Sequence, residues 1–416
     1  MSKIESIKQY EGNVLDTIFF RPMLTGPSAE QMGLKVLYNM PTPTTLHFWR
    51  RSGDILNKFV TGGWNGGTPA AKYQKKIELN RVKAEMAYGA DDYFSTVYEL
   101  ITSRPDVNFE NLSGTELEEA ETALFRASIA ESIRSTMWYG LTTRPNGRLT
   151  TFDGLVKRIL SDTNIGSSTA ITKYFGYFKD DSNPQWAEKL LKDLWEKSSA
   201  ELKSLRSEGQ LAFFVTTDVY NAYEEALDNV AHEAAYLAKQ NGREGLYYRG
   251  IPLVDVQLDA YHDNVRDLPH SFAILTDRRN LALAVNTNDF PGTEVRMWYN
   301  PDMMENRQRA VFMAGCDYLL PELITVAVGV PVKNITYTLD GGVLQMNMDN
   351  RPDSFALDSI EILTYNDDGE LELDCETLTI NSDKSTIQMQ GVTSVSSYVL
   401  RFYYDAGIVV DVAFEG

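Results

Sequence analysis

A glycine-rich turn between two aromatic arms is the feature that most constrains this fold. Within residues 46–89 the stretch TGGWNGGTP places four glycines between arms that partly alternate apolar and polar residues. This pattern is typical of a β-hairpin, and arms of about fifteen residues would reach about 50 Å. A lone two-stranded ribbon is barely stable in water, and this one carries four large aromatic side chains: Phe48, Trp49, Phe59 and Trp64. We therefore expect the ribbon to lie on another subunit.

A long helix over residues 113–140 is the second strong signal. Two capping boxes compete at its start: Ser113 with Glu116, and Thr115 with Glu118. Apolar residues recur along one side at helical spacing, and Gly140 is a plausible stop. The helix would be about 36–40 Å long, which exceeds the globular average. We expect it to act as a spine.

The middle of the chain predicts short helices and strands with short connections. A helix is expected over residues 185–207. Residues 210–227 change from a strand to a helix, with Thr217 or Asp218 as the N-cap. Residues 245–261 predict a hairpin. This region is therefore predicted to be α+β.

Residues 271–286 predict a buried strand, a turn and a second apolar run. The turn is the charged tetrad Asp277-Arg278-Arg279-Asn280. Two interpretations remain open for it: a turn held by its own hydrogen bonds and ion pairs, or a contact between subunits, because Arg is favoured at interfaces. A similar choice between core packing and interface applies to four aromatic residues: Tyr247, Tyr248, Trp298 and Tyr299.

Residues 284–329 have strand-like ends and a strongly amphipathic middle. The pattern predicts that Cys316 lies on a helix beside Ala314 and Gly315, as a small core residue. The segment lacks any pairing of nucleophile with base and any metal-ligand spacing. We expect its role to be packing.

The pattern of apolar and polar residues changes after residue 330. Residues 331–416 contain at least seven short alternating runs separated by turns such as LDGG and NDDGE. This is the signature of an antiparallel β-sandwich of immunoglobulin-like size. Its 15 acidic and 4 basic residues give a charge of −11, which leaves −8 of the total −19 for the other residues. We expect an appended domain with its own charge balance.

Length and charge limit the classes of protein that the chain can form. A chain of 416 residues is expected to form two or three domains. A net charge of −19 argues against a protein that coats nucleic acid. Cys316 and Cys375 are the only cysteines, so a reducing compartment is expected. The N-terminus has no signal-peptide core, and the longest apolar run, 323–332, is too short to span a membrane. These features predict a cytosolic, soluble protein.

Motifs that carry chemistry are incomplete. HEAAY has Tyr236 where a zinc helix needs its second ligand, and GGWNGGTP lacks the Lys of a phosphate loop. YNDDGE at 365–370 lacks the ligand spacing of a calcium loop and is better explained as a hairpin turn. We predict no catalytic, cofactor-binding or metal-binding residue.

The order of four short stretches after the ribbon and the spine helix is informative. The stretches are NGRLTTFDGLVKRI, FFVTTDVYNAYEEAL, YRGIPLVDVQLD with Gly250 to Leu253, and ILTDRRNLALAVN with Asp277, Asn280 and Leu281. In this order, residues 1–330 resemble the major capsid proteins of tailed bacteriophages, the Hong Kong 97 fold. The resemblance implies an α+β fold with an N-terminal arm (1–44), an E-loop (45–82), a P domain with its spine helix (83–149), an A domain (150–290), a return to the P domain (291–330) and, appended, the immunoglobulin-like β-sandwich (331–416).

The resemblance implies a structural subunit, not an enzyme. Such a chain would assemble with itself, as hexamers and pentamers, into the icosahedral capsid of a virion that encloses double-stranded DNA without sequence-specific binding. The portal and a separate scaffolding protein would be its partners, with no cofactor and no membrane. Assembly would take place in the cytoplasm of the bacterial host. The sandwich would be an outward knob that binds weakly to glycans or other surfaces.

Some relatives cross-link the ribbon covalently to the P domain. Lys72, Lys75 and Lys76 lie in this ribbon, but no residue-level match carries that chemistry over to them. Two other functions remain open. The first is an encapsulin-type nanocompartment shell, which shares the fold. The second is a cytosolic enzyme with a site assembled from scattered residues such as Asp255, His262 and Asp277.

Overall fold

The computed structural model of the chain describes residues 26–40, 44–50, 71–89, 116–144, 149–162, 171, 173–177, 179, 183–230, 245–265, 267–286 and 296–330, together with eight strands between 334 and 415. Helices and sheets alternate up to residue 330, and strands alone follow among the described residues. The α+β class expected from the sequence is confirmed.

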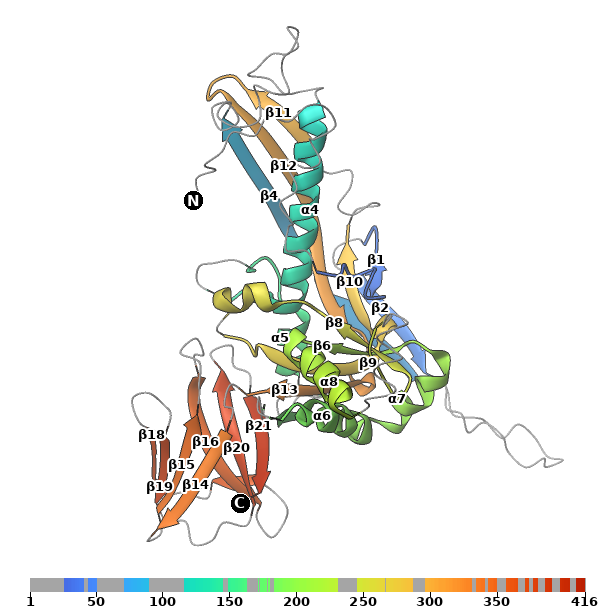
Figure 1. Cartoon of the computed structure of the whole chain (residues 1–416). Coiled ribbons are helices and arrows are strands. Elements are labelled where there is room, and N and C mark those ends of the chain that lie inside the picture. Colours follow the sequence, from blue (N-terminus) through green and yellow to red (C-terminus); the bar gives the residue numbers. More distant parts are fainter. Residues whose placement is uncertain are drawn as a thin grey trace, which may run out of the picture.

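A long antiparallel blade runs beside the spine helix and away from the rest of the chain (Figure 1). Its strands are β4 (Asn80–Gly89), β11 (Arg296–Asn300) and β12 (Glu305–Tyr318), and β12 pairs with both of the others. The helix beside it is α4 (Glu116–Tyr139). Near the base of the blade, β10 (Leu281–Val285) joins β12.

The spine helix ends where the sequence predicts. Its last turn is closed by a hydrogen bond from the Gly140 amide to the Thr136 carbonyl. Ser113 and Thr115, the predicted capping residues, lie outside the described residues. The blade sheet is completed by β1 (Lys35–Leu37), which pairs in parallel with β10 and brings the arm to the base of the blade.

Residues 305–318 form a strand, so the helix predicted around Cys316 is wrong. Alternate residues of β12 are buried from Asn306 to Ala314, a period of two that is that of a strand, and every residue from Ala314 to Tyr318 is buried. The Cys316 thiol donates to the carbonyls of Met137 and Asp153 at 3.5 and 3.3 Å. Cys316 is fully buried, so its predicted role as a small core residue is confirmed.

A six-stranded sheet forms the second body. Its strands are, in spatial order, β5 (Tyr174–Tyr177), β13 (Ile324–Gly329), β9 (Ser271–Asp277), β6 (Leu211–Val215), β8 (Ile251–Asp255) and β7 (Tyr247–Tyr248). The predicted hairpin in 245–261 is β7–β8. The predicted strand, turn and second run in 271–286 are β9, the 3₁₀ turn η3 (Arg278–Asn280) and β10.

This sheet has a hydrophobic core on each face. Phe214 and Phe272 face the core that also holds the end of α4, where Trp138 lies 5.9 and 5.8 Å from their rings. Phe213 and Leu275 face the other core. The helices around the sheet are α5 (Leu155–Ser161), α6 (Gln185–Lys197), α7 (Ala200–Ser204) and α8 (Thr217–Val230), with 3₁₀ turns η1 (Leu205–Glu208), η2 (Asp259–Asn264) and η4 (Pro321–Leu323).

Two details of the predicted helices are corrected. The helix expected over 185–207 is divided into α6, α7 and η1, because Ser198 and Ser199 adopt extended backbone angles. The Ser199 hydroxyl then caps α7 by accepting from the Leu202 amide at 3.1 Å. The next helix, α8, begins at Thr217, so Thr217 and Asp218 lie inside its first turn and neither is the N-cap.

The predicted ribbon is present as the hairpin β2 (Thr44–Arg50) and β3 (Ala71–Ile77), paired from Thr44 opposite Ile77 to Arg50 opposite Ala71. Its glycine-rich tip lies outside the described residues. The contact of the ribbon with another subunit stays a prediction.

The C-terminal region forms two four-stranded antiparallel sheets, as a sandwich requires. One sheet contains β14 (Asn334–Asp340), β15 (Val343–Asp349), β19 (Thr386–Gln390) and β18 (Thr377–Ile380). The other contains β17 (Leu371–Leu373), β16 (Leu357–Tyr365), β20 (Ser397–Tyr404) and β21 (Val409–Glu415). Figure 1 shows them beside the six-stranded sheet.

Gly140 packs without room for a side chain, which makes a testable prediction. A Cβ atom there would lie 2.1 Å from the Phe152 carbonyl oxygen. We expect Gly140→Ala to lower the free energy of unfolding by about 3 kcal/mol, the upper end for overpacking. Gly209→Ala is the control: Gly209 has a φ of +69° and no atom within 4 Å of its Cβ position, so the cost should be only about 1 kcal/mol. Urea unfolding of both variants measures this, and equal losses would contradict the packing argument.

Candidate functional site

The residues proposed for a scattered enzyme site are not brought together. Asp255 pairs opposite Val215 at one end of β6, whereas Asp277 pairs opposite Leu211 at its other end. Four residues of strand separate them by about 13 Å. His262 instead stacks on His270, with ring centroids 4.4 Å apart. Among the described residues there is also no group of three or more side chains that could hold a metal ion.

The charged tetrad is a turn held by its own bonds. The Asp277 carboxylate is buried and accepts from the amide of Arg279 at 2.8 Å and from its guanidinium at 2.6 Å. The buried Asn280 amide donates to the Leu320 carbonyl at 2.9 Å. Arg279 reaches outward to Glu208 at 2.7 Å. The first of the two interpretations, a self-bonded turn, accounts for these contacts.

A buried ion pair joins the spine helix to two other parts of the chain. Arg134 of α4 donates to both carboxylate oxygens of Glu131, at 2.8 and 2.5 Å. It also donates to the carbonyls of Val256 and Gln257, at 2.5 and 3.1 Å, in the segment after β8. The Gly26 amide of the arm donates to Glu131 at 3.3 Å. We call these five residues the spine node.

A small pocket lies beside the spine node. Its volume is about 270 Å³, and its lining includes Arg134, Asp255, Asp259 and Tyr261. Burial, and next the hydrogen bond to Glu131 at 2.6 Å, raise the pKa of Tyr261 to about 12. Burial also raises the pKa of Asp255, although that carboxylate accepts bonds from Gln257 and Thr217. Tyr261 and Arg134 both donate to Glu131, and Asp255 accepts from Gln257 and Thr217, so these lining groups are engaged in contacts that hold the framework.

A second charged cluster fixes the base of the hairpin. Lys75 of β3 lies 3.3 Å from the buried carboxylate of Asp317 on β12, and its ammonium sits 4.0 Å from the centre of the Tyr318 ring. Arg158 of α5 reaches the other oxygen of Asp317 at 3.4 Å. The direction of the hairpin is therefore set by contacts within the chain. Lys76 pairs only with its neighbour Glu78 among the ion pairs of the described residues.

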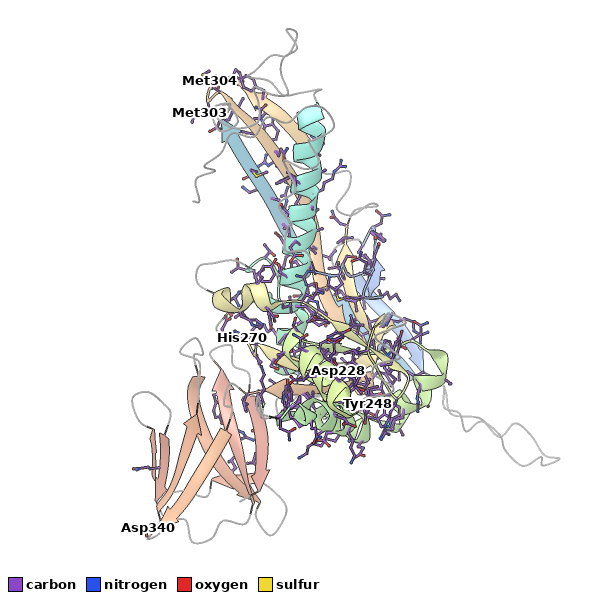
Figure 2. All side chains as sticks on the ribbon, viewed as in Figure 1. Asp228, Tyr248, His270, Met303, Met304 and Asp340 are labelled. Atoms are coloured by element: carbon purple, nitrogen blue, oxygen red, sulfur yellow. The ribbon has the colours of Figure 1, made fainter. Side chains whose placement is uncertain are left out.

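The far end of the blade exposes large apolar side chains. Met303 and Met304 lie in the turn between β11 and β12, exposed by 64% and 54%, and Figure 2 shows both at the outer end of the blade. Met86 on β4 and Trp298 on β11 are also exposed near this end, on opposite faces of the sheet, because they pair with the consecutive residues Gln308 and Arg307 of β12. We call these four residues the blade tip. Exposed apolar side chains at the end of a long arm are candidates for contact with another protein.

The ambiguous aromatic residues divide between core and surface. Tyr248 packs on Phe213 and Tyr223 in a core, and Tyr299 is half-buried. Tyr247 is 56% exposed on β7, at the edge of the six-stranded sheet, and Trp298 belongs to the blade tip. Sequence reasoning found Trp298 but missed the methionines, whose signal was two adjacent Met residues in a turn.

Comparisons with known proteins give matches among solved structures alone. No family model matches the chain, and no curated protein matches it. Solved structures do match. The capsid of a native GTA particle is 12% identical, with a TM-score of 0.45, over 74% of this chain and 91% of that one. The capsid of Myoviridae phage XM1 is 13% identical, with a TM-score of 0.43, over 72% and 91%. Mycobacterium phage Che8 is 11% identical, with a TM-score of 0.42, over 79% and 96%.

Likeness of this degree identifies no functional residue. Within the part of the chain that the structure describes, no helix is long and apolar enough to cross a membrane.

The spine node makes a testable prediction. Arg134→Met leaves the Glu131 carboxylate buried without its cation, and losing one partner of a buried pair costs about 3–5 kcal/mol of stability. Adding Glu131→Gln should recover part of the loss, because no unpaired charge remains. Tyr261→Phe, which removes one hydrogen bond, is the control and should cost about 1 kcal/mol. Denaturant unfolding measures all three, and a loss under about 1 kcal/mol for Arg134→Met would show that the node does not hold the fold.

Proposed function

We propose that this chain is the structural subunit of an icosahedral capsid shell, that of a tailed bacteriophage, and that it works by binding copies of itself. The observation that carries the proposal is the blade tip: four exposed apolar side chains at the end of a long blade, held away from both cores. The order of elements supports it, since hairpin, spine helix, six-stranded sheet and returning strand follow one another as in the Hong Kong 97 resemblance.

The physical logic is that of a shell held by many moderate contacts. Burying apolar surface contributes roughly 25 cal/mol per Å², and the blade tip gains this only when another molecule covers it. A closed shell of one subunit type repeats such contacts around its symmetry axes. If an arm is stable only when another subunit covers it, then assembly of the shell also stabilises each subunit.

The finer features of the proposal follow from the resemblance. Hexamers and pentamers would form the shell, with a portal and a separate scaffolding protein as partners and the bacterial cytoplasm as the place of assembly. The domain boundaries of the proposal are those expected from the sequence: E-loop 45–82, P domain 83–149 and 291–330, and A domain 150–290. The net charge of −19 suits a shell that encloses double-stranded DNA without gripping it.

The two sheets of residues 334–415 support an immunoglobulin-like sandwich as an added domain of the subunit. On the proposed shell it would be an outward knob that binds weakly to glycans or other surfaces.

Electron microscopy tests the main proposal. We expect the chain, expressed alone and with its neighbouring genes, to form closed shells or rings tens of nanometres across. Shells that contain enzyme cargo in place of DNA would favour the encapsulin alternative. A monomer of 46.9 kDa in both preparations would overturn the capsid proposal.

The blade tip gives a sharper prediction. The double variant Met303→Ser, Met304→Ser should reduce the yield of assembled particles at least tenfold, while the unfolding free energy of the unassembled subunit stays within about 0.5 kcal/mol, as is usual for exposed positions. Lys192→Ser on α6 is the control, because its side chain is similarly exposed at 57% but is not apolar. Normal yield from the double variant, measured by sedimentation, would show that the tip is not an assembly surface.

A further inference from the structure

Two edge strands from different bodies lie against each other. β5 is the edge of the six-stranded sheet, and β21 is the edge of one sandwich sheet. β21 packs beside β5, and Figure 1 shows the sandwich meeting the six-stranded body on this side. An uncovered edge strand presents unpaired amides and carbonyls that can pair with another chain. In this arrangement the two edge strands, β5 and β21, therefore cover each other.

Apolar packing continues across this junction. Val410 of β21 is fully buried and belongs to the hydrophobic core that lies under the six-stranded sheet and the spine helix. Tyr174 of β5 packs against the same core. Val330, which follows β13 and leads to the sandwich, is buried there too. A domain that was only tethered would have no side chain in that core.

A polar contact lies beside the apolar one. Arg401 and Asp411 are directly opposite in the β20–β21 register, joined by two hydrogen bonds of 2.8 and 2.9 Å. The Asp411 carboxylate also lies close enough to Tyr174 for its charge to act on the Tyr174 hydroxyl. Burial, and then the charge of Asp411, raise the pKa of Tyr174 to about 12, against the opposing effect of Arg401. The tyrosine is therefore a neutral donor at physiological pH.

We propose that the C-terminal sandwich is docked on β5 as a fixed cap of the sheet edge, through Val410 and the Tyr174–Asp411 contact. The occupant of the β5 edge is the chain's own sandwich. The sandwich thus has a defined orientation on the subunit, and β5 is closed to pairing with a strand of another molecule. This inference does not depend on the proposed shell, since it concerns the isolated subunit.

Hydrogen exchange on the full-length, unassembled chain tests the docking. Two variants each remove one side of the contact: Tyr174→Phe on the six-stranded sheet and Asp411→Ala on the sandwich. Each has a matched control. Tyr247→Phe alters an exposed tyrosine at the opposite edge of the same sheet. Asp340→Ala removes a carboxylate from the sandwich sheet that does not contain β21, at the position labelled in Figure 2.

We expect both contact variants to speed amide exchange in residues 173–177 by about fivefold, the effect of losing one polar contact, with no change in either control. The double variant should add little to the larger single effect, because both changes remove the same contact. Exchange in residues 397–404 reports whether the sandwich itself stays folded. Unchanged exchange in residues 173–177 for both contact variants, with the sandwich intact, would overturn the proposal and leave the sandwich as a tethered knob.

Discussion

The guanidinium of Arg134 holds three distant parts of the chain at one point. It lies in the second half of the spine helix and binds Glu131 one turn earlier, the carbonyls of Val256 and Gln257 beyond β8, and a carboxylate that also receives the Gly26 amide. Removing a charge from water is costly unless every donor is satisfied. The arm, the helix and the six-stranded sheet must therefore meet here in one arrangement. The orientation of the blade relative to the sheet depends on that arrangement.

The strand β12 carries this orientation outward. Its inner end supplies Cys316, which bonds to the spine helix, and Asp317, which binds Lys75 of the hairpin. Its outer end leads to the exposed Met303 and Met304. One strand therefore sets the directions of both the hairpin and the blade tip. In a proposed shell subunit, contacts with other subunits are made far from the core. Their positions therefore depend on how firmly β12 is held in place.

The errors of sequence reasoning have specific physical causes. Near its start, at the outer end of the blade, β12 has two polar residues, Asn306 and Gln308, on its buried face. Their polarity hides the alternation that is typical of a strand, and the sequence therefore favours a helix. Hydrophobic alternation is therefore visible only from Ala310 onward. The helix expected over 185–207 was predicted as continuous because nothing in its composition marks the break at Ser198, which depends on backbone angles and on the cap supplied by Ser199. The hairpin, the spine helix and the switch from β6 to α8 were predicted correctly, because local spacing alone decides them.

The sequence also predicts the candidate surface and the spine node only in part. Trp298 could be named in advance as a core or interface residue, but exposure decided between the two. Glu131 and Arg134 are spaced like an ordinary surface pair on a helix, and only packing against the segment after β8 shows that they are buried.

By itself, the sequence determined the α+β class, the hairpin, the spine helix and the strand-rich region beyond residue 330, since these depend on residue periodicity and turn chemistry within a few neighbours. The tertiary structure alone decided the strand character of residues 305–318, the spine node, the exposure of the blade tip and the packing of β21 beside β5. Each of these joins residues that are far apart in the chain. Burial is a property of the assembled fold, so local patterns do not carry it.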